Sequence, residues 1–244
     1  MIPFFRKIRK QFADDNKPIK YMRYAIGEIV LVVIGILIAL SINNWNNKRI
    51  EHKIEKQFLS EIVINLKDDY KQVQKVLDFN KTKDSVIIET MQLMSRASNL
   101  ERRTKISSLL PTLAEYEVFL PNRVAFDNMT SSFSINLISN DSLRQILSSY
   151  YKNTLHLTDF TQEQIKDQTR KFVDESITLL VDDDLVKKLT GLDLKINQLE
   201  DFYTNPRTFK NLFNMRMNMV SQNNLLDYIK KQIDLILLKI KQEN

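Results

Sequence analysis

One apolar segment constrains this chain more than any other feature of its sequence. The segment YAIGEIVLVVIGILIALSINNWNN begins at Tyr24, and its eighteen most apolar positions, residues 25–42, hold a single charged side chain, Glu28. Eighteen residues of helix are about 27 Å long, close to the roughly 30 Å hydrocarbon thickness of a bilayer. The sequence therefore predicts a transmembrane helix over residues 24–45, with aromatic anchors Tyr24 and Trp45 at the two interfaces.

A cleaved secretion signal is the alternative interpretation of the same segment. Ala39-Leu40-Ser41 offers small residues in a plausible cleavage arrangement. Against this alternative, 23 residues precede the span, and the apolar run exceeds the usual core of a signal peptide. We therefore expect a retained anchor.

The distribution of basic residues predicts both the orientation and the class of partner. Seven Lys and Arg precede the span and four follow it closely, so residues 1–23 are expected in the cytoplasm and residues 46–244 on the other side. The formal charge of the chain is +6, of which +5 belongs to residues 1–23. The large domain is thus nearly neutral and lacks the basic footprint of a nucleic-acid-binding protein.

The basic start of the chain also has an amphipathic pattern. Four apolar side chains fall on one helical side, and four basic side chains lie between them; the eight are Phe4, Phe5, Ile8, Phe12, Arg6, Lys7, Arg9 and Lys10. Such a helix lies in the interface of an anionic leaflet, which makes membrane lipid a predicted partner. A frayed tail that serves only to orient the span is the alternative.

Glu28 shares one side of the predicted membrane helix with four other residues. These residues recur at steps of four and three: Glu28, Val32, Gly35, Ala39 and Ile42. The pair Gly35-x-x-x-Ala39 lets two helix backbones approach closely, which predicts a membrane-helix association face. Three interpretations of Glu28 stay open: it reaches the headgroups, it bonds to a partner helix, or it carries protons.

The sequence contains no familiar catalytic or cofactor-binding pattern. Cysteine is absent, the two histidines have no second ligand at metal-binding spacing, and three distant glycines form no phosphate-binding loop. Asp182-Asp183-Asp184 offers oxygens but lacks the pattern of a calcium loop. We therefore expect a protein that is not an enzyme and binds no metal or cofactor.

Beyond the span, apolar residues step by three or four, which predicts an all-α fold. We expect one N-terminal transmembrane helix followed by an antiparallel bundle of long amphipathic helices outside the membrane. A polar connection is expected at residues 99–103, a mixed stretch at 109–133, and a short extended piece at 116–120. Helices are expected to begin at Asn140 or Asp141 and at Asn205-Pro206. The predicted apolar side of the last helix comprises Phe209, Phe213, Met217, Val220, Ile229, Ile233, Ile236, Leu237 and Ile240.

The order of these features resembles a known family. The segments YAIGEIVLVVIGILIAL, NNWN and SSFSINLISNDSLRQILSSYY are similar to those of an uncharacterised bacterial family of single-span inner-membrane proteins, common in flavobacteria, that carry a domain of unknown function. The resemblance implies an inner-membrane address. It implies no activity and no functional residues.

Three classes of function remain after these exclusions. The leading one is a non-enzymatic scaffold or accessory subunit that acts by self-association, as a homo-oligomer, or by binding another envelope protein. The second is an ion-coupled subunit of an envelope motor or channel that uses Glu28. The third is a periplasmic domain that senses a small ligand between its helices.

Overall fold

The computed structural model describes residues 18–96, 100–132, 134–176, 187–188, 191–193 and 199–243. Within these ranges the regular elements are helices, and no strand is present, so the predicted all-α class is confirmed there. The main elements are α2 (Pro18–Met94), α3 (Leu100–Ala114), α4 (Val124–Ser131), the 3-10 helix η1 (Ser134–Leu137), α5 (Asp141–Ser176), α7 (Leu199–Thr204) and α8 (Pro206–Glu243).

The chain divides into two compact units, residues 1–56 and residues 57–244, and helix α2 contributes to both. In the first unit, α2 contains an 18-residue window with a mean hydropathy of 2.8, none of which is buried. By length and composition, this is the one helix among the described residues that could cross a membrane. Exposed apolar surface of this extent is unfavourable in water, so it requires lipid or protein around it.

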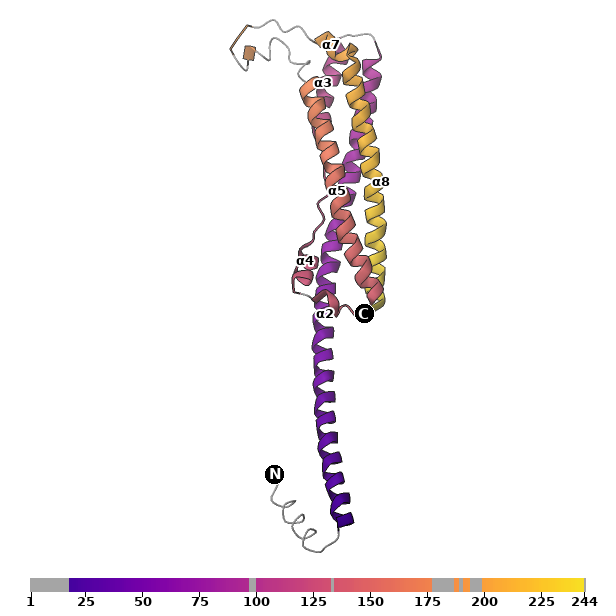
Figure 1. The fold of residues 1–244 in the computed structure, drawn as a ribbon. Helices are drawn as coiled ribbons and strands as arrows, with labels where there is room; N and C mark the ends of the chain where they lie inside the picture. The colour runs from indigo at the N-terminus through magenta and orange to yellow at the C-terminus, as the bar shows by residue number, and fades with distance from the viewer. Residues whose placement is uncertain are drawn as a thin grey trace. The chain divides into compact units, whose positions relative to one another are not determined.

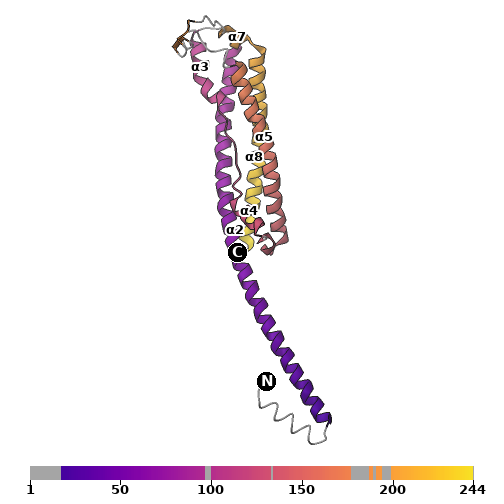
Figure 2. The same cartoon turned by 60° about the vertical axis from the view of Figure 1, so that its left-hand side comes forward.

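The second unit is built on three long helices that lie side by side: residues 57–94 of α2, α5 and α8 (Figures 1 and 2). Helix α5 runs in the direction of α2, and α8 runs in the opposite direction. Between α2 and α5 the chain returns along the bundle through α3, the non-helical residues 115–123 and α4. The bundle is therefore antiparallel with four arms, one of which is composite.

Most buried side chains on α2 and α8 recur with a seven-residue period, in alternating steps of three and four. This period keeps one side of a helix against its neighbours through a left-handed supercoil. In α2 the buried positions on the period are Leu59, Ile62, Leu66, Asp69, Val73, Val76, Asn80, Lys83, Ile87 and Thr90. In α8 they are Thr208, Leu212, Met215, Met219, Gln222, Leu226, Ile229, Ile233, Ile236 and Ile240.

The predicted starts of two helices are confirmed by their capping bonds. The Oδ1 atom of Asn140 accepts a hydrogen bond from the Leu143 backbone N–H at 3.0 Å, as a side chain at the N-cap does. Helix α8 begins at Pro206, and the Oδ1 atom of Asn205 accepts from the Arg207 N–H at 2.9 Å. Proline suits this first helical position because it has no N–H to leave unpaired.

Two local predictions from the sequence were wrong. The expected polar connection at residues 99–103 is helical from Leu100 onward, and the mixed stretch expected from residue 109 begins inside α3, which continues through Pro111 to Ala114. The helix continues through Pro111 because the side chains of Ile106 and Leu113, on either side of the proline in sequence, are fully buried. Burial of apolar side chains on both sides of Pro111 outweighs the one backbone hydrogen bond that proline removes.

The apolar side of α8 was predicted correctly from Ile229 to Ile240, but near the start of the helix it was predicted one residue away from its true position. The four side chains expected to be buried near the start of the helix are 44–51% exposed; they are Phe209, Phe213, Met217 and Val220. Leu212, Met215 and Met219 are buried instead. The true core side of this part of the helix contains polar residues such as Thr208 and Gln222, so the exposed side has the more regular apolar pattern.

Candidate functional site

The predicted association face lies along the first unit's part of α2, and it is open in the single chain. Val32 and Ile42 are 54% and 61% exposed, Ala39 is exposed, and Glu28 is half-buried. A Cβ atom placed on Gly35 would meet nothing within 4 Å. The face therefore has room at its centre for the close approach of a second backbone.

The two aromatic anchors at the ends of the predicted span have different surroundings. Tyr24 is half-buried, and Trp45 is 65% exposed, with the Arg49 guanidinium 5.8 Å from the centre of its ring. The other predicted interface residues, Phe4, Phe5, Arg6, Lys7, Ile8, Arg9, Lys10 and Phe12, lie outside the described residues.

No metal-binding group is formed by the part of the chain that the structure describes, since no three His, Cys, Asp or Glu side chains lie together there. His52 is paired with Glu55 through Nδ1 and Oε2 at 3.1 Å, and His156 is exposed on α5. Asp182, Asp183 and Asp184 lie outside the described residues.

The structure shows a buried carboxyl group that the sequence analysis did not single out. Asp69 occupies a core position of α2 and is fully buried. Its Oδ1 atom accepts from the Asn122 backbone N–H at 2.7 Å, and its Oδ2 atom accepts from the Tyr150 hydroxyl at 3.1 Å. Burial raises the pKa of Asp69 from 3.8 to about 6, although both hydrogen bonds favour the charged form.

The two tyrosines of α5 beside Asp69 remain protonated. Burial raises the pKa of Tyr150 far above its usual range, and the negative charge of Asp69 raises it further. The same two causes, in the same order, raise the pKa of Tyr151. Tyr151 also stacks on Phe126 with ring centres 4.4 Å apart. The Asp69 site is therefore enclosed by aromatic side chains, and a dissolved substrate does not reach it.

Lys83 is a second buried ionisable group on the same side of α2. It is 2% exposed, and its Nζ atom donates to the backbone carbonyl of Glu115. Burial lowers the pKa of Lys83 from 10.5 to about 8, while the nearby Glu115 acts in the opposite direction. Burial thus pushes both Asp69 and Lys83 toward their uncharged forms.

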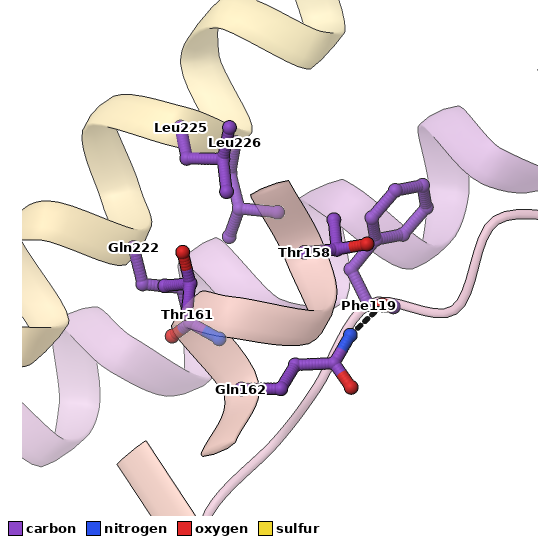
Figure 3. A pocket seen from close by; sticks show the side chains of 7 residues that line it. All are labelled: Phe119, Thr158, Thr161, Gln162, Gln222, Leu225 and Leu226. Carbon is purple, nitrogen blue, oxygen red and sulfur yellow. Dashed lines mark hydrogen bonds between the residues drawn. The ribbon is translucent and has the colours of Figure 1, made fainter. Parts of the chain in front are cut away.

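We call residues 115–122, which make up most of the non-helical stretch between α3 and α4, the strap. Its alternate carbonyls accept hydrogen bonds from side chains of three different helices. Lys83 of α2 reaches the carbonyl of residue 115, the Gln222 Nε2 atom of α8 reaches that of residue 117 at 3.2 Å, and Gln162 of α5 reaches that of Phe119 (Figure 3). These polar side chains thus bond to the strap's carbonyls as the backbone N–H groups of a neighbouring strand would in a sheet.

A small pocket lies beside the strap, between α5 and α8 (Figure 3). Its volume is about 10 Å³, which is room for about one water molecule. A larger, open cleft of about 280 Å³ lies between α2 and α8. Its rim carries the ion pair of the Arg216 Nε and Asp84 Oδ1 atoms at 2.7 Å.

The structure therefore adds two sets of candidate functional residues to the predicted membrane face. The first is the set of polar core positions of α2, which the sequence analysis missed because it followed apolar letters only. A search for charged residues on the seven-residue period of Leu59, Ile62 and Leu66 would have found Asp69 and Lys83. The second is the exposed apolar stripe of α8 described above, which the sequence analysis assigned to the core.

Comparison with known proteins gives one match. A family model, described as a family of unknown function (DUF6090), matches residues 28–197. The match includes most of the predicted membrane segment, the strap and α5, and it ends before α8. No curated protein matches, and no solved structure matches.

Proposed function

The chain belongs to the family of unknown function DUF6090, which supplies no activity, and we propose that it is a non-enzymatic, membrane-anchored helical protein that acts by binding. In this proposal residues 24–45 cross a bacterial inner membrane, the N-terminus is cytoplasmic, and residues 46–244 form a periplasmic domain. The observation that supports it most is the unburied window of α2 with a mean hydropathy of 2.8.

The occupant that we propose for the membrane face is a second copy of the chain. Helices in lipid associate through close packing, which small residues allow. Gly35 has open space around it, and Val32 and Ile42 are exposed on either side of it. A second copy carries the same face in the same membrane and orientation, so the two faces can meet in a parallel pair.

This self-association has a direct test in mild detergent. The mass of the full chain is measured across dilution for the wild type and for Gly35→Leu, whose larger side chain fills the open space. The dissociation constant of Gly35→Leu is expected to rise at least tenfold, which corresponds to about 1.4 kcal/mol. Gly27→Leu is the matched control, because Gly27 also has open space but lies off the face.

Two results of that test would contradict self-association. One is a wild-type chain that stays monomeric at every concentration and gives no cross-linked dimer in membranes. The other is an equal weakening by Gly27→Leu and Gly35→Leu, which would show that the effect does not depend on the face.

Binding to another envelope protein is a second candidate, and the exposed stripe of α8 favours it. The stripe consists of Phe209, Phe213, Met217 and Val220, each close to half exposed. Lys210 flanks it on one side, Arg216 on the other side is paired with Asp84 at 2.7 Å, and α8 contains no acidic residue before Asp227. These features fit an amphipathic helix with an acidic residue opposite Lys210 better than a second copy of the stripe, whose own Lys210 would repel it.

A photoreactive residue at position 213 tests this candidate in native membranes. The expected product joins α8 to a peptide of another protein that has an apolar face flanked by an acidic residue. A photoreactive residue in place of Ser221, which is exposed on α8 but lies off the stripe, is the control and is expected to give no such product. Cross-linking only to a second copy, or equally from both positions, would contradict the candidate.

The ion-coupled alternative depends on the proton chemistry of Glu28. Glu28→Gln keeps the size of the side chain and removes its charge. If the chain acts only by binding, this variant is expected to assemble normally and to leave the cellular phenotype unchanged. A lost phenotype with intact assembly would favour ion coupling over the scaffold that we propose.

A further inference from the structure

The strap fills the seam between α2 and α5 in the second unit. Its C-terminal end is bonded to Asp69 of α2, which also accepts from Tyr150 of α5. Its N-terminal end is bonded to Lys83 of α2, and Gln162 of α5 holds its middle. The strap therefore contacts both helices that form the seam, and Gln222 reaches it from α8.

The spacing of the two bonded ends fits an extended chain. Asp69 and Lys83 lie on the same side of α2, two seven-residue periods apart, which is about 21 Å along a helix. Six residues, 116–121, lie between the carbonyl of residue 115 and the N–H of residue 122, and six extended residues span about 20 Å. The two lengths agree, as expected for an extended strap between two buried ionisable groups of opposite charge.

We propose that the strap is a proton-controlled conformational device, which docks in the seam through Asp69 and Lys83 and is released most readily near neutral pH. This proposal goes beyond the proposed function and does not depend on it, because every residue involved belongs to the second unit. Release of the strap would open the seam between α2 and α5 to water and would uncover both ionisable groups.

The other charged groups around the two ends are mostly neutralised in pairs. Near Asp69 these groups are Asp68 of α2, Tyr150 and Tyr151 of α5, the pair of Arg123 and Asp127 at α4, and Lys230 of α8, which lies over the ring of Tyr70. Near Lys83 they are Glu115, the pair of Lys75 and Glu117, and the pair of Arg216 and Asp84. Burial is the largest influence on both Asp69 and Lys83.

The direction of the pH effect follows from these two shifts. The docked state raises the pKa of Asp69 to about 6, so it binds that proton more tightly, and docking weakens as the pH rises through 6. The docked state lowers the pKa of Lys83 to about 8, so it binds that proton less tightly, and docking strengthens as the pH rises above 8. Docking is therefore weakest between about pH 6 and pH 8.

Hydrogen exchange of the full chain in detergent micelles, measured by mass spectrometry with short labelling times, tests the proposal. Rates are divided by those of an unstructured peptide at the same pH, which gives the protection factor of the Asn122 amide, the strap N–H that donates to Asp69. The expected protection at pH 5 and at pH 9 is about tenfold higher than at pH 7. At pH 7 the strap is also expected to exchange faster than the core of α8, since only the strap opens.

The profile of protection against pH has an acid limb, below pH 6, and an alkaline limb, above pH 8. One variant tests each limb. Asp69→Asn is expected to remove the rise in protection below pH 6 and to keep the rise above pH 8. Lys83→Met is expected to do the reverse. Asp68→Asn and Lys81→Met are matched controls, because the Asp68 side chain is 47% exposed and Lys81 is exposed on α2; both controls are expected to keep the two limbs.

Three results would overturn the proposal: a flat profile, a profile with its maximum between pH 6 and pH 8, or an Asp69→Asn variant that keeps the acid limb. Equal protection of the strap and the α8 core at pH 7 would also overturn it, because the strap would then open only with the whole bundle. If a variant loses its helical circular dichroism, the wild-type profile alone decides.

Discussion

Tyr150 and Tyr151 are neighbours in sequence and equally enclosed, yet the environments of their hydroxyl groups differ. The Tyr150 hydroxyl donates to Asp69 at 3.1 Å, whereas the buried Tyr151 hydroxyl has no hydrogen-bond partner among the described residues. A hydrogen bond to a buried charge contributes about 1.5–3 kcal/mol, but a buried hydroxyl without a partner is itself unfavourable. A comparison of the two tyrosines therefore measures the free energy of the hydrogen bond separately from that of burying the ring.

Removal of the two hydroxyl groups is expected to have opposite consequences. Tyr150→Phe should lower the free energy of unfolding by about 1.5–3 kcal/mol at pH 7.5, because Asp69 keeps its charge and loses a donor. Tyr151→Phe should change it by less than about 0.5 kcal/mol or raise it. Urea unfolding followed by circular dichroism measures both; equal losses would show that the Asp69 contact contributes nothing specific.

The raised pKa of Asp69 also predicts how global stability depends on pH. The folded state binds the Asp69 proton more tightly than the unfolded state, so this contribution is complete below pH 3.8 and is lost as the pH rises to about 6. The two pKa values differ by about two units, which corresponds to about 3 kcal/mol.

Asp69→Asn should remove this pH dependence. Relative to the wild type, the variant should gain up to about 3 kcal/mol of stability between pH 4 and pH 6.5, because its neutral amide no longer responds to pH. Urea unfolding of both proteins at several pH values measures the difference. A difference that stays constant over this range would mean that Asp69 titrates alike in the folded and unfolded chain.

Residue-level features such as Asp69 and Lys83 were not predictable from apolar patterning. A charged side chain inside the repeat interrupts the pattern of apolar residues that reveals the repeat. Their hydrogen-bond partners, Asn122 and the carbonyl of residue 115, come from a segment more than thirty residues away. Contacts between such distant segments follow from the path of the chain, which local periodicity does not contain.

Helix α8 shows the same difficulty at the scale of an element. The sequence predicted its existence, its start and its later core residues correctly, because Ile229, Ile233 and Ile236 repeat on the core side. Near its start, two sides of the helix carry large apolar residues, and periodicity alone does not say which of them is buried. The bundle buries the side with the polar Thr208 and Gln222, and the Gln222 side chain finds its partner in the strap.

Two adjacent positions of α8 test this assignment. Leu212→Ala should lower the free energy of unfolding by about 2–5 kcal/mol, because Leu212 is fully buried. Phe213→Ala should lower it by less than about 1 kcal/mol, because that ring is 48% exposed. Chemical unfolding of the two variants under identical conditions measures both, and the reverse order would place Phe213 in the core.

For the whole molecule, the sequence predicted the fold class and the antiparallel course of the long helices. It did so because apolar residues at steps of three and four indicate long amphipathic helices, and such helices bury their apolar sides by packing as a bundle. It did not predict that one arm of the bundle is a composite of α3, the strap and α4. A sequence rich in Tyr, Val, Phe and Leu at residues 116–120 indicates extended chain, but its partner in the fold is a set of polar side chains, not a strand.

The central claim of this account is that the apolar part of α2 remains embedded in lipid. It is tested by alkaline carbonate washing of membranes from cells that produce the chain, followed by intact mass spectrometry. We predict that the protein stays with the membranes, is released only by detergent and has the full mass of 28.8 kDa. Recovery in the aqueous wash, or a mature chain that begins near residue 42, would contradict the account.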